Sequence, residues 1–204
     1  MLANFLWSFI IHTKVRVMKK IYLFLLISVV VLSGCTHIRG KNQATNEPLA
    51  SPQDSMGTLS LTSSVFEPQG IIPSRYTCDG KDVNPPLSIT GVPQGTQSFV
   101  LIVDDPDAPS GDFVHWVVWN ISAFVNDIPE NSVPEGAVQG MTDFGRTGWG
   151  GPCPPSGTHR YQFKVYALGT SLSLTASSKK KDVESAMAGH ILDETVLVGT
   201  YKRR

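Results

Sequence analysis

The sequence predicts an all-β fold with one or two short helices, in a chain of 204 residues. Beyond residue 57, short segments rich in β-branched and aromatic residues alternate with clusters of Gly, Pro, Asn and Asp, which is the pattern of strands and turns. In two of these segments, alternate side chains can be assigned to the two faces of a strand. Only one stretch has apolar residues at helical spacing. Because no internal repeat interrupts this pattern, we expect residues 57–204 to form a single β-domain.

The expected strands follow one another at short intervals. They are "TLSLTS" (58–63), "PLSIT" (86–90), "SFVLIVDD" (98–105), "FVHWVVWNI" (113–121), "HRYQFKVYAL" (159–168) and "ETVLVGTYKR" (194–203). In 159–168, strict alternation places His159 and Tyr161 on the apolar face and Arg160 on the opposite face. In 113–121, His115 falls on the face of Val117 and Trp119, and both faces are apolar. The strand over 113–121 is therefore expected to be covered on both sides.

The expected helix lies in "SSKKKDVESAMAGHI" (177–191). Ser177 or Ser178 can cap its N-terminus, and Val183, Met187 and Ile191 recur at a spacing of four residues. Its run of three lysines is expected to face solvent.

The first 35 residues differ in composition from the rest of the chain. They hold four basic residues and no acidic ones, which leaves 13 basic and 17 acidic residues beyond. "MKKIYLFLLISVVVLSGC" has a basic start, an apolar run of signal-peptide length and an ending, Leu32 to Cys35, that resembles a bacterial lipobox. We expect a signal segment over 1–35 whose true start is Met18, a lipid on Cys35 and a flexible polar tether over 36–56. An ordinary secretory signal is the alternative.

Several functional classes do not fit the sequence. The mildly acidic body lacks the basic patch of a nucleic-acid-binding protein. The sequence contains no G-x-S-x-G elbow, Walker loop, H-E-x-x-H motif or C-x-x-C pair. An exported chain with two cysteines besides Cys35 favours a Cys78–Cys153 disulfide, with two buried thiols as the alternative. Pairing of a nucleophilic cysteine with His115 or His159 is a further alternative.

The stretch "VDDPDAPSGDFVHWVVWN" (103–120) gathers four aspartates ahead of a histidine. Such a group is compatible with a metal site, an acid/base pair or a polar pocket for a small ligand. Together with "YTCDGKDVNPPLSI" (76–89) and "GPCPPSGTHRYQF" (151–163), this stretch resembles the phosphatidylethanolamine-binding protein family, in its bacterial branch called Raf kinase inhibitor-like. The resemblance covers about Thr58 to Tyr201, and its motifs occur in family-like order and spacing.

The resemblance implies an antiparallel β-sandwich with a small anion-accepting pocket at one end. Its pocket residues match seven positions here: Asp105, Asp107, His115, Gly151, Pro152, His159 and Tyr161. Animal members also carry a C-terminal helix over the pocket, which we do not expect here because the sequence ends soon after the last expected strand. Phospholipid specificity and kinase regulation are therefore not inferred from the resemblance.

The residues themselves suggest how such a pocket would work. If Asp105 or Asp107 hydrogen-bonds an imidazole, that histidine is held in one tautomer and its pKa rises, so that it can donate to an anion. The proline-rich run after Gly151 would form a stiff wall. As alternatives, Asp105 could start a turn, and His115 and His159 could be core residues. Asp104 and Asp112 are assigned to the turn, Trp149 could rim the pocket, and Arg146 could add positive charge near its mouth.

We therefore expect a binding protein that holds a small phosphate- or carboxylate-like ligand, with a phospholipid head group as one candidate. An inhibitor or regulator of a protease or other protein is the alternative, and a metal-dependent hydrolase is a further one. We expect no catalytic residues, metal or cofactor and no nucleic-acid partner. The lipobox implies a membrane-anchored lipoprotein that faces the periplasm or lies at the cell surface. Because Thr36 follows Cys35, the outer membrane is favoured in a Gram-negative cell.

Overall fold

A computed structural model describes residues 58–204 of the chain. The predicted signal segment, the lipidated Cys35 and the tether lie outside the described residues. The described part contains no helix that is long and apolar enough to cross a membrane.

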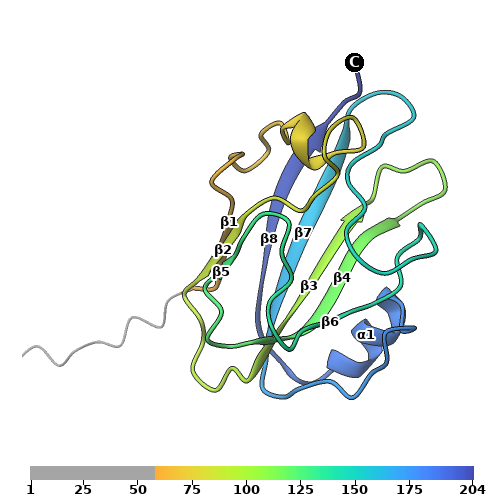
Figure 1. Ribbon diagram of the computed structural model, residues 1–204. Helices are drawn as coiled ribbons and strands as arrows, with labels where there is room; N and C mark the ends of the chain where they lie inside the picture. The colour runs from red at the N-terminus through yellow and green to blue at the C-terminus, as the bar shows by residue number, and fades with distance from the viewer. Residues whose placement is uncertain (1–57) are drawn as a thin grey trace, which may run out of the picture. The chain divides into compact units, whose positions relative to one another are not determined.

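The described strands form two antiparallel sheets, as the strand-like pattern predicts (Figure 1). The larger sheet has the order β6-β4-β3-β7-β8, and the smaller has the order β1-β2-β5. The strands are β1 (Ser60–Thr62), β2 (Leu87–Thr90), β3 (Ser98–Asp105), β4 (Phe113–Ser122), β5 (Asp127–Ile128), β6 (Val138–Gln139), β7 (His159–Leu168) and β8 (Ile191–Tyr201). A short 3₁₀ helix, η1 (Ser74–Tyr76), and one α-helix, α1 (Lys180–Met187), complete the elements.

The middle of the larger sheet is buried on both faces, which explains the apolar runs of its strands. All eight residues of β3 are buried, and β3 pairs with β4 on one side and β7 on the other. Phe99, Leu101 and Val103 point into a core shared with the smaller sheet, whereas Val100 and Ile102 point into a second core on the side of α1. A strand covered on both faces reads as a continuous apolar run rather than an alternating one.

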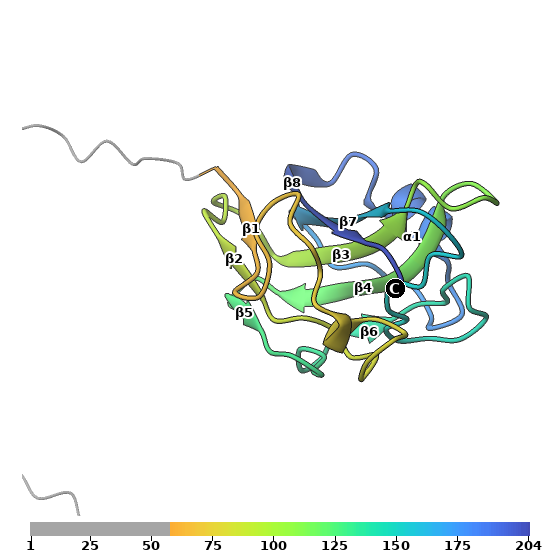
Figure 2. The ribbon, with the colours of Figure 1, turned by 90° about the horizontal axis from the view of Figure 1, so that it is seen from above.

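The first core fills the space between the two sheets. Leu61 of β1, Leu87 and Ile89 of β2 and Ile128 of β5 pack there against Phe163 of β7. Figure 2, seen from above, shows the smaller sheet as a separate layer beside the larger one. This arrangement is the sandwich that the family resemblance implies, and the mostly β class is confirmed.

The helix α1 covers the other face of the larger sheet, with Val183 and Met187 in the second core. Its bounds differ from the expected ones: Lys179 is the N-cap, and Asp182 accepts a hydrogen bond of 2.9 Å from the Lys179 backbone N–H. The helix ends at Met187, and Gly189 follows with φ of 79°, a conformation that favours glycine. Ile191 therefore begins β8 instead of ending the helix.

The lysine run at the start of α1 is not simply solvated, which corrects the sequence-based expectation. Lys180 Nζ lies 2.6 Å from an oxygen of Asp104, which is fully buried and also pairs with Lys164 at 2.7 Å. Lys180 contacts the exposed Asp112 as well. Asp104 and Asp112 are thus joined through Lys180 rather than serving a turn, and Asp104 ties β3 and β7 to the helix. Burial alone would lower the pKa of Lys180, but its hydrogen bonds to the two aspartates outweigh this effect and raise it.

Candidate functional site

The end of the larger sheet brings three of the predicted site residues together. β3 ends at Asp105, and the antiparallel pairing of Asp104 with Gln162 places Asp105 beside the start of β7. His159 and Tyr161 lie there on the buried face of β7, as the alternation predicts. Asp105 follows the parity of Val103 and therefore points to the same side, whereas its neighbour Asp104 points toward α1.

A β-bulge brings the fourth residue, His115, to this side. Val103 pairs with Trp116 and Asp104 pairs with Val114, so His115 is the extra residue of β4 at that point. Simple alternation placed His115 with Val117 and Trp119, which lie in the core on the α1 side. The bulge turns it instead toward Tyr161, whose ring meets the imidazole edge-on with centroids 5.2 Å apart.

These residues line a cavity of about 340 Å³ between the loop that follows β3 and the loop that precedes β7. Polar side chains of Asp105, His115, His159 and Tyr161 lie on one part of its lining. The remaining lining is mainly apolar and consists of Ala108, Pro109, Ser110, Phe113, Phe144, Cys153, Pro154 and Pro155. Most small-molecule sites combine an apolar lining with a few convergent polar groups in this way.

His159 and Asp105 form a buried pair in the cavity. Nδ1 of His159 lies 2.7 Å from Oδ2 of Asp105, and both side chains are at least nine-tenths buried. The second oxygen of Asp105 accepts a hydrogen bond of 2.9 Å from the backbone N–H of Asp107. Because an ionised carboxylate only accepts, Nδ1 must carry a proton, and Nε2 is left to meet a ligand. Asp105 therefore orients the imidazole.

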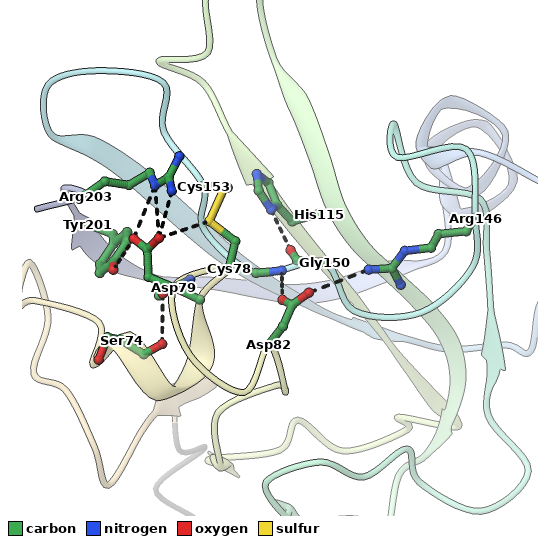
Figure 3. The surroundings of a disulfide bond; sticks show 12 residues. Ser74, Cys78, Asp79, Asp82, His115, Arg146, Gly150, Cys153, Tyr201 and Arg203 are labelled. Atoms are coloured by element: carbon green, nitrogen blue, oxygen red, sulfur yellow. Dashed lines mark hydrogen bonds and ion pairs between the residues drawn. A yellow bond between two sulfur atoms is a disulfide. The ribbon is translucent and has the colours of Figure 1, made fainter.

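His115 is oriented by the backbone rather than by an acid. Its Nδ1 lies 2.6 Å from the carbonyl oxygen of Gly150, and the Gly150 N–H donates to the His115 carbonyl at 3.1 Å (Figure 3). A carbonyl only accepts, so Nδ1 is protonated here too. Burial lowers the pKa of His115 below its ordinary 6.5, although the Gly150 carbonyl and nearby Asp105 oppose the shift. The condition stated from the sequence, an imidazole held by Asp105 or Asp107 with a raised pKa, is therefore not met at His115.

Tyr161 adds a hydroxyl donor to the same group. Its oxygen is buried and has no hydrogen-bond partner within residues 58–204. Burial, reinforced by the negative charge of Asp105, raises the pKa of Tyr161, so the hydroxyl keeps its proton at neutral pH. A buried hydroxyl without a partner is costly, which makes an acceptor atom in the cavity favourable.

Asp107 does not meet either histidine. It accepts hydrogen bonds from the backbone N–H of Arg160 at 2.9 Å and from the guanidinium at 2.8 and 2.6 Å. These bonds hold the pKa of the Asp107 carboxyl at about 2, and the side chain does not line the cavity. Its role here is indirect, because its backbone N–H supports Asp105. The sequence showed no partner for it, since Arg160 lies 53 residues away.

Gly151 and Pro152 support the cavity wall from behind instead of lining it. The Gly151 N–H donates to Asp82 at 2.6 Å, and the Pro152 carbonyl accepts from Cys78 N–H at 3.2 Å. The next residue, Cys153, lines the cavity and is bonded to Cys78 (Figure 3). We call residues 150–155 the wall segment, because they close one side of the cavity.

Four other residues lie in or near the cavity wall region. Trp149 does not rim the cavity: it is buried, stacked on Phe163 and edge-on to Trp116. Phe113 and Phe144, by contrast, line the cavity and contact His115 at ring-centroid distances of 5.3 Å, although sequence reasoning missed them. Arg146 lies over the Phe144 ring at 5.7 Å, near the lining but not part of it.

The cavity contains little fixed charge. Asp105 is the one acidic side chain of its lining, and the lining includes no Lys or Arg. Within residues 58–204, no three His, Cys, Asp or Glu side chains are grouped to hold a metal ion. The arrangement offers hydrogen-bonding groups on a rigid frame, with two imidazoles whose free nitrogens can accept a proton or donate one.

The fold and the cavity define a β-sandwich protein with a pre-formed small-molecule site. Comparison with known proteins agrees: the phosphatidylethanolamine-binding protein family model matches residues 62–202. The UPF0098 protein of Methanothermobacter thermautotrophicus is 49% identical over 150 residues, which cover 71% of this chain and 99% of that protein. The UPF0098 protein of Aquifex aeolicus is 53% identical over 139 residues, covering 65% of this chain and 81% of that one.

Two solved structures are also similar. A putative phosphatidylethanolamine-binding protein homologue from Chlamydia trachomatis is 40% identical, with a TM-score of 0.70 and coverage of 72% of this chain and 99% of that chain. YbcL of Escherichia coli, described as a new member of the mammalian family, is 34% identical, with a TM-score of 0.68 and the same coverage. The chain belongs to the phosphatidylethanolamine-binding protein family, and this membership supports a protein that binds a small ligand.

Proposed function

We propose that this protein binds a small anion, with a phosphate- or carboxylate-like group, in the cavity beside His115, His159 and Tyr161. The observation that supports this most directly is that the lining of one cavity holds both imidazoles together with Tyr161, and that each imidazole has its Nδ1 already held by an acceptor. Each imidazole has its Nδ1 engaged, so each has Nε2 left for a ligand oxygen. A phospholipid head group is one candidate for the source of the anion.

The charge of the cavity favours a monoanion, or an anion that brings a proton with it. A dianion next to Asp105 would meet like charge without any Lys or Arg in the lining to offset it. A neutral imidazole can accept a proton from a ligand hydroxyl, and a charged one can donate to a bare oxygen. The apolar residues on the remaining lining leave room for an uncharged part of the ligand.

We expect phosphate and phosphorylethanolamine to raise the melting temperature of the protein. At a ligand concentration 100 times Kd, the stabilisation is about 2.7 kcal/mol, or roughly 5–10 °C for a domain of this size. The His159→Ala substitution removes one of the oriented nitrogens and should abolish the shift. Differential scanning calorimetry with increasing ligand measures both.

A matched control is His190→Ala, which removes an exposed histidine that does not line the cavity. That variant should keep the full shift. If neither phosphate, phosphorylethanolamine nor acetate shifts the melting temperature of the unsubstituted protein, the proposed anion site is wrong.

We also expect affinity for a non-titrating monoanion, methanesulfonate, to fall as pH rises through a window that begins below 6.5. In the free protein, burial lowers the pKa of His115 below 6.5. A bound anion favours the charged imidazole and raises this pKa, so binding takes up a proton. Affinity is therefore highest below the free-protein pKa and is lost between that value and the raised value of the complex. Titration calorimetry at several pH values measures it.

The contribution of His115 to the pH dependence of binding must be distinguished from that of the other groups that face it. Asp105, His159 and Tyr161 also face the cavity, and the Tyr161 hydroxyl stays protonated because burial raises its pKa. The His115→Gln variant isolates the contribution of His115. Its methanesulfonate affinity should depend less on pH than that of the parent protein; an unchanged profile would assign the dependence to another group.

We propose further that the protein is exported and held at a membrane by a lipid on Cys35. The support is the lipobox-like ending of the signal segment. Cells grown with labelled palmitate should yield a labelled protein in the membrane fraction, and Cys35→Ser should remove both the label and the membrane association. Label retained in that variant would contradict an anchor at Cys35.

A further inference from the structure

The wall segment is held at its two ends by different kinds of bond. At one end, Gly150 exchanges two hydrogen bonds with His115. Toward the other end, at Cys153, the disulfide with Cys78 ties the segment to the loop that follows η1. Figure 3 shows the disulfide and the Gly150–His115 contact in the same neighbourhood. The wall segment therefore links the disulfide to the atom that orients a cavity histidine.

The two cysteines of the disulfide are accessible to a reductant in solution. Cys78 and Cys153 are both exposed, and neither belongs to either of the two apolar cores. Cys153 also lines the cavity. Cleavage of this bond would consequently leave both cores intact while releasing a residue of the cavity lining.

Besides the disulfide, two hydrogen bonds and the close packing of Gly151 against the backbone of Tyr76 and Thr77 join the wall segment to residues 76–82. The hydrogen bonds join Gly151 N–H to Asp82 and Cys78 N–H to the Pro152 carbonyl. Asp82 is exposed and its other oxygen lies 3.9 Å from Arg146, so its bond to Gly151 competes with water. Without the covalent tie, Gly151 and Pro152 keep these contacts, but Cys153 loses its attachment to the loop that follows η1.

We propose that the Cys78–Cys153 disulfide is a reducible modification site, and that its reduction by a dithiol weakens ligand binding in the cavity. The inference rests on the proposed anion-binding function. A loosened wall segment holds the Gly150 carbonyl less firmly against His115 Nδ1, so the imidazole is less well oriented toward a ligand. The apolar wall formed by Cys153, Pro154 and Pro155 becomes mobile as well.

The chemistry needs a dithiol reductant and balances as a two-electron exchange. One reductant thiolate attacks a sulfur of the disulfide, the bond between Cys78 and Cys153 breaks, and the departing cysteine thiolate takes up a proton. The second reductant thiolate then attacks the mixed disulfide and releases the other cysteine, which also takes up a proton. The protein gains two electrons and two protons, and the reductant becomes a disulfide.

Thermodynamic linkage makes the proposal testable from both directions. If reduction weakens binding by some factor, the bound ligand must oppose reduction by the same factor. We expect reduction with dithiothreitol to weaken phosphate and phosphorylethanolamine binding about tenfold, a typical size for coupling between two sites. Saturating phosphate should shift the dithiothreitol titration of the disulfide by the same factor toward a higher ratio of reduced to oxidised reagent.

The Cys78→Ser/Cys153→Ser double variant is the control. It should bind like the reduced protein and should not respond to dithiothreitol, so a response that persists would point to Cys35 or to a general effect of the reagent. Far-UV circular dichroism of the reduced protein and of the double variant should match that of the oxidised protein. Global unfolding on reduction would overturn a local effect on the cavity.

The outcomes separate this inference from the proposed function. Equal affinity of the oxidised and reduced proteins, or tighter binding after reduction, overturns the redox inference and leaves the anion site standing. Absence of anion binding by the oxidised protein overturns both.

Discussion

Asp104→Ala should lower the free energy of unfolding by about 3–5 kcal/mol, the usual loss when one partner of a buried ion pair is removed. Asp104 is fully buried, and the ammonium groups of Lys164 and Lys180 lie 2.7 and 2.6 Å from its Oδ2. Removing the carboxylate leaves two positive charges on side chains that are only 21% and 14% exposed. Chemical denaturation of the parent and the variant measures the difference.

Asp112→Ala is the matched control, because Asp112 contacts the same Lys180 from the surface, with 45% of its side chain exposed. Its loss should cost no more than about 1 kcal/mol, since exposed ion pairs contribute little. Adding Lys180→Met to the Asp104→Ala variant should restore part of the stability by removing one of the two positive charges that Asp104 no longer balances. Equal losses in the Asp104 and Asp112 variants would contradict a buried tie between the sheet and α1.

The difference between Asp104 and Asp105 shows which parts of the site can be predicted from sequence. Adjacent residues of a strand point to opposite faces, so Asp104 and Asp105 had to lie on opposite faces of the sheet. The alternation of residues 159–168 likewise placed His159 and Tyr161 on the buried face. Which acid met the cavity followed from the family resemblance. That Asp104 would meet Lys180, 76 residues later, depended on how α1 docks, and no local pattern contains that information.

The orientation of His115 could not be predicted for a different reason. A bulge shifts one strand by a single residue relative to its neighbour, and the shift is visible only when the pairing with β3 is known. The partner of His115 is a backbone carbonyl, which any residue carries, so the identity of residue 150 carried no signal. Asp107 was misplaced because its partner, Arg160, lies on the outward face of β7, where the alternation indicated only exposure.

Gly151→Ala should weaken anion binding at least as strongly as it lowers stability. A Cβ at residue 151 would lie 2.6 Å from both Asp82 Oδ1 and the Tyr76 carbonyl oxygen, and 2.8 Å from Thr77 Cα. Two of these atoms belong to the backbone and cannot turn aside, so the wall segment must move. Overpacking of this kind costs about 1–3 kcal/mol, and the displaced segment includes the Gly150 carbonyl that orients His115. Thermal unfolding and phosphate titration of the same variant measure the two effects.

Gly169→Ala is the control for glycine replacement itself. A Cβ there meets its nearest neighbour, a Leu192 carbon, at 3.6 Å, which is an ordinary contact, and Gly169 does not line the cavity. This variant should keep the parent's phosphate affinity and lose little stability. Phosphate affinity that survives Gly151→Ala despite the loss of stability would mean that the position of the wall segment does not control the cavity. Because Cys153 lies two residues further along the same segment, that result would also remove the physical basis for coupling the disulfide to the ligand.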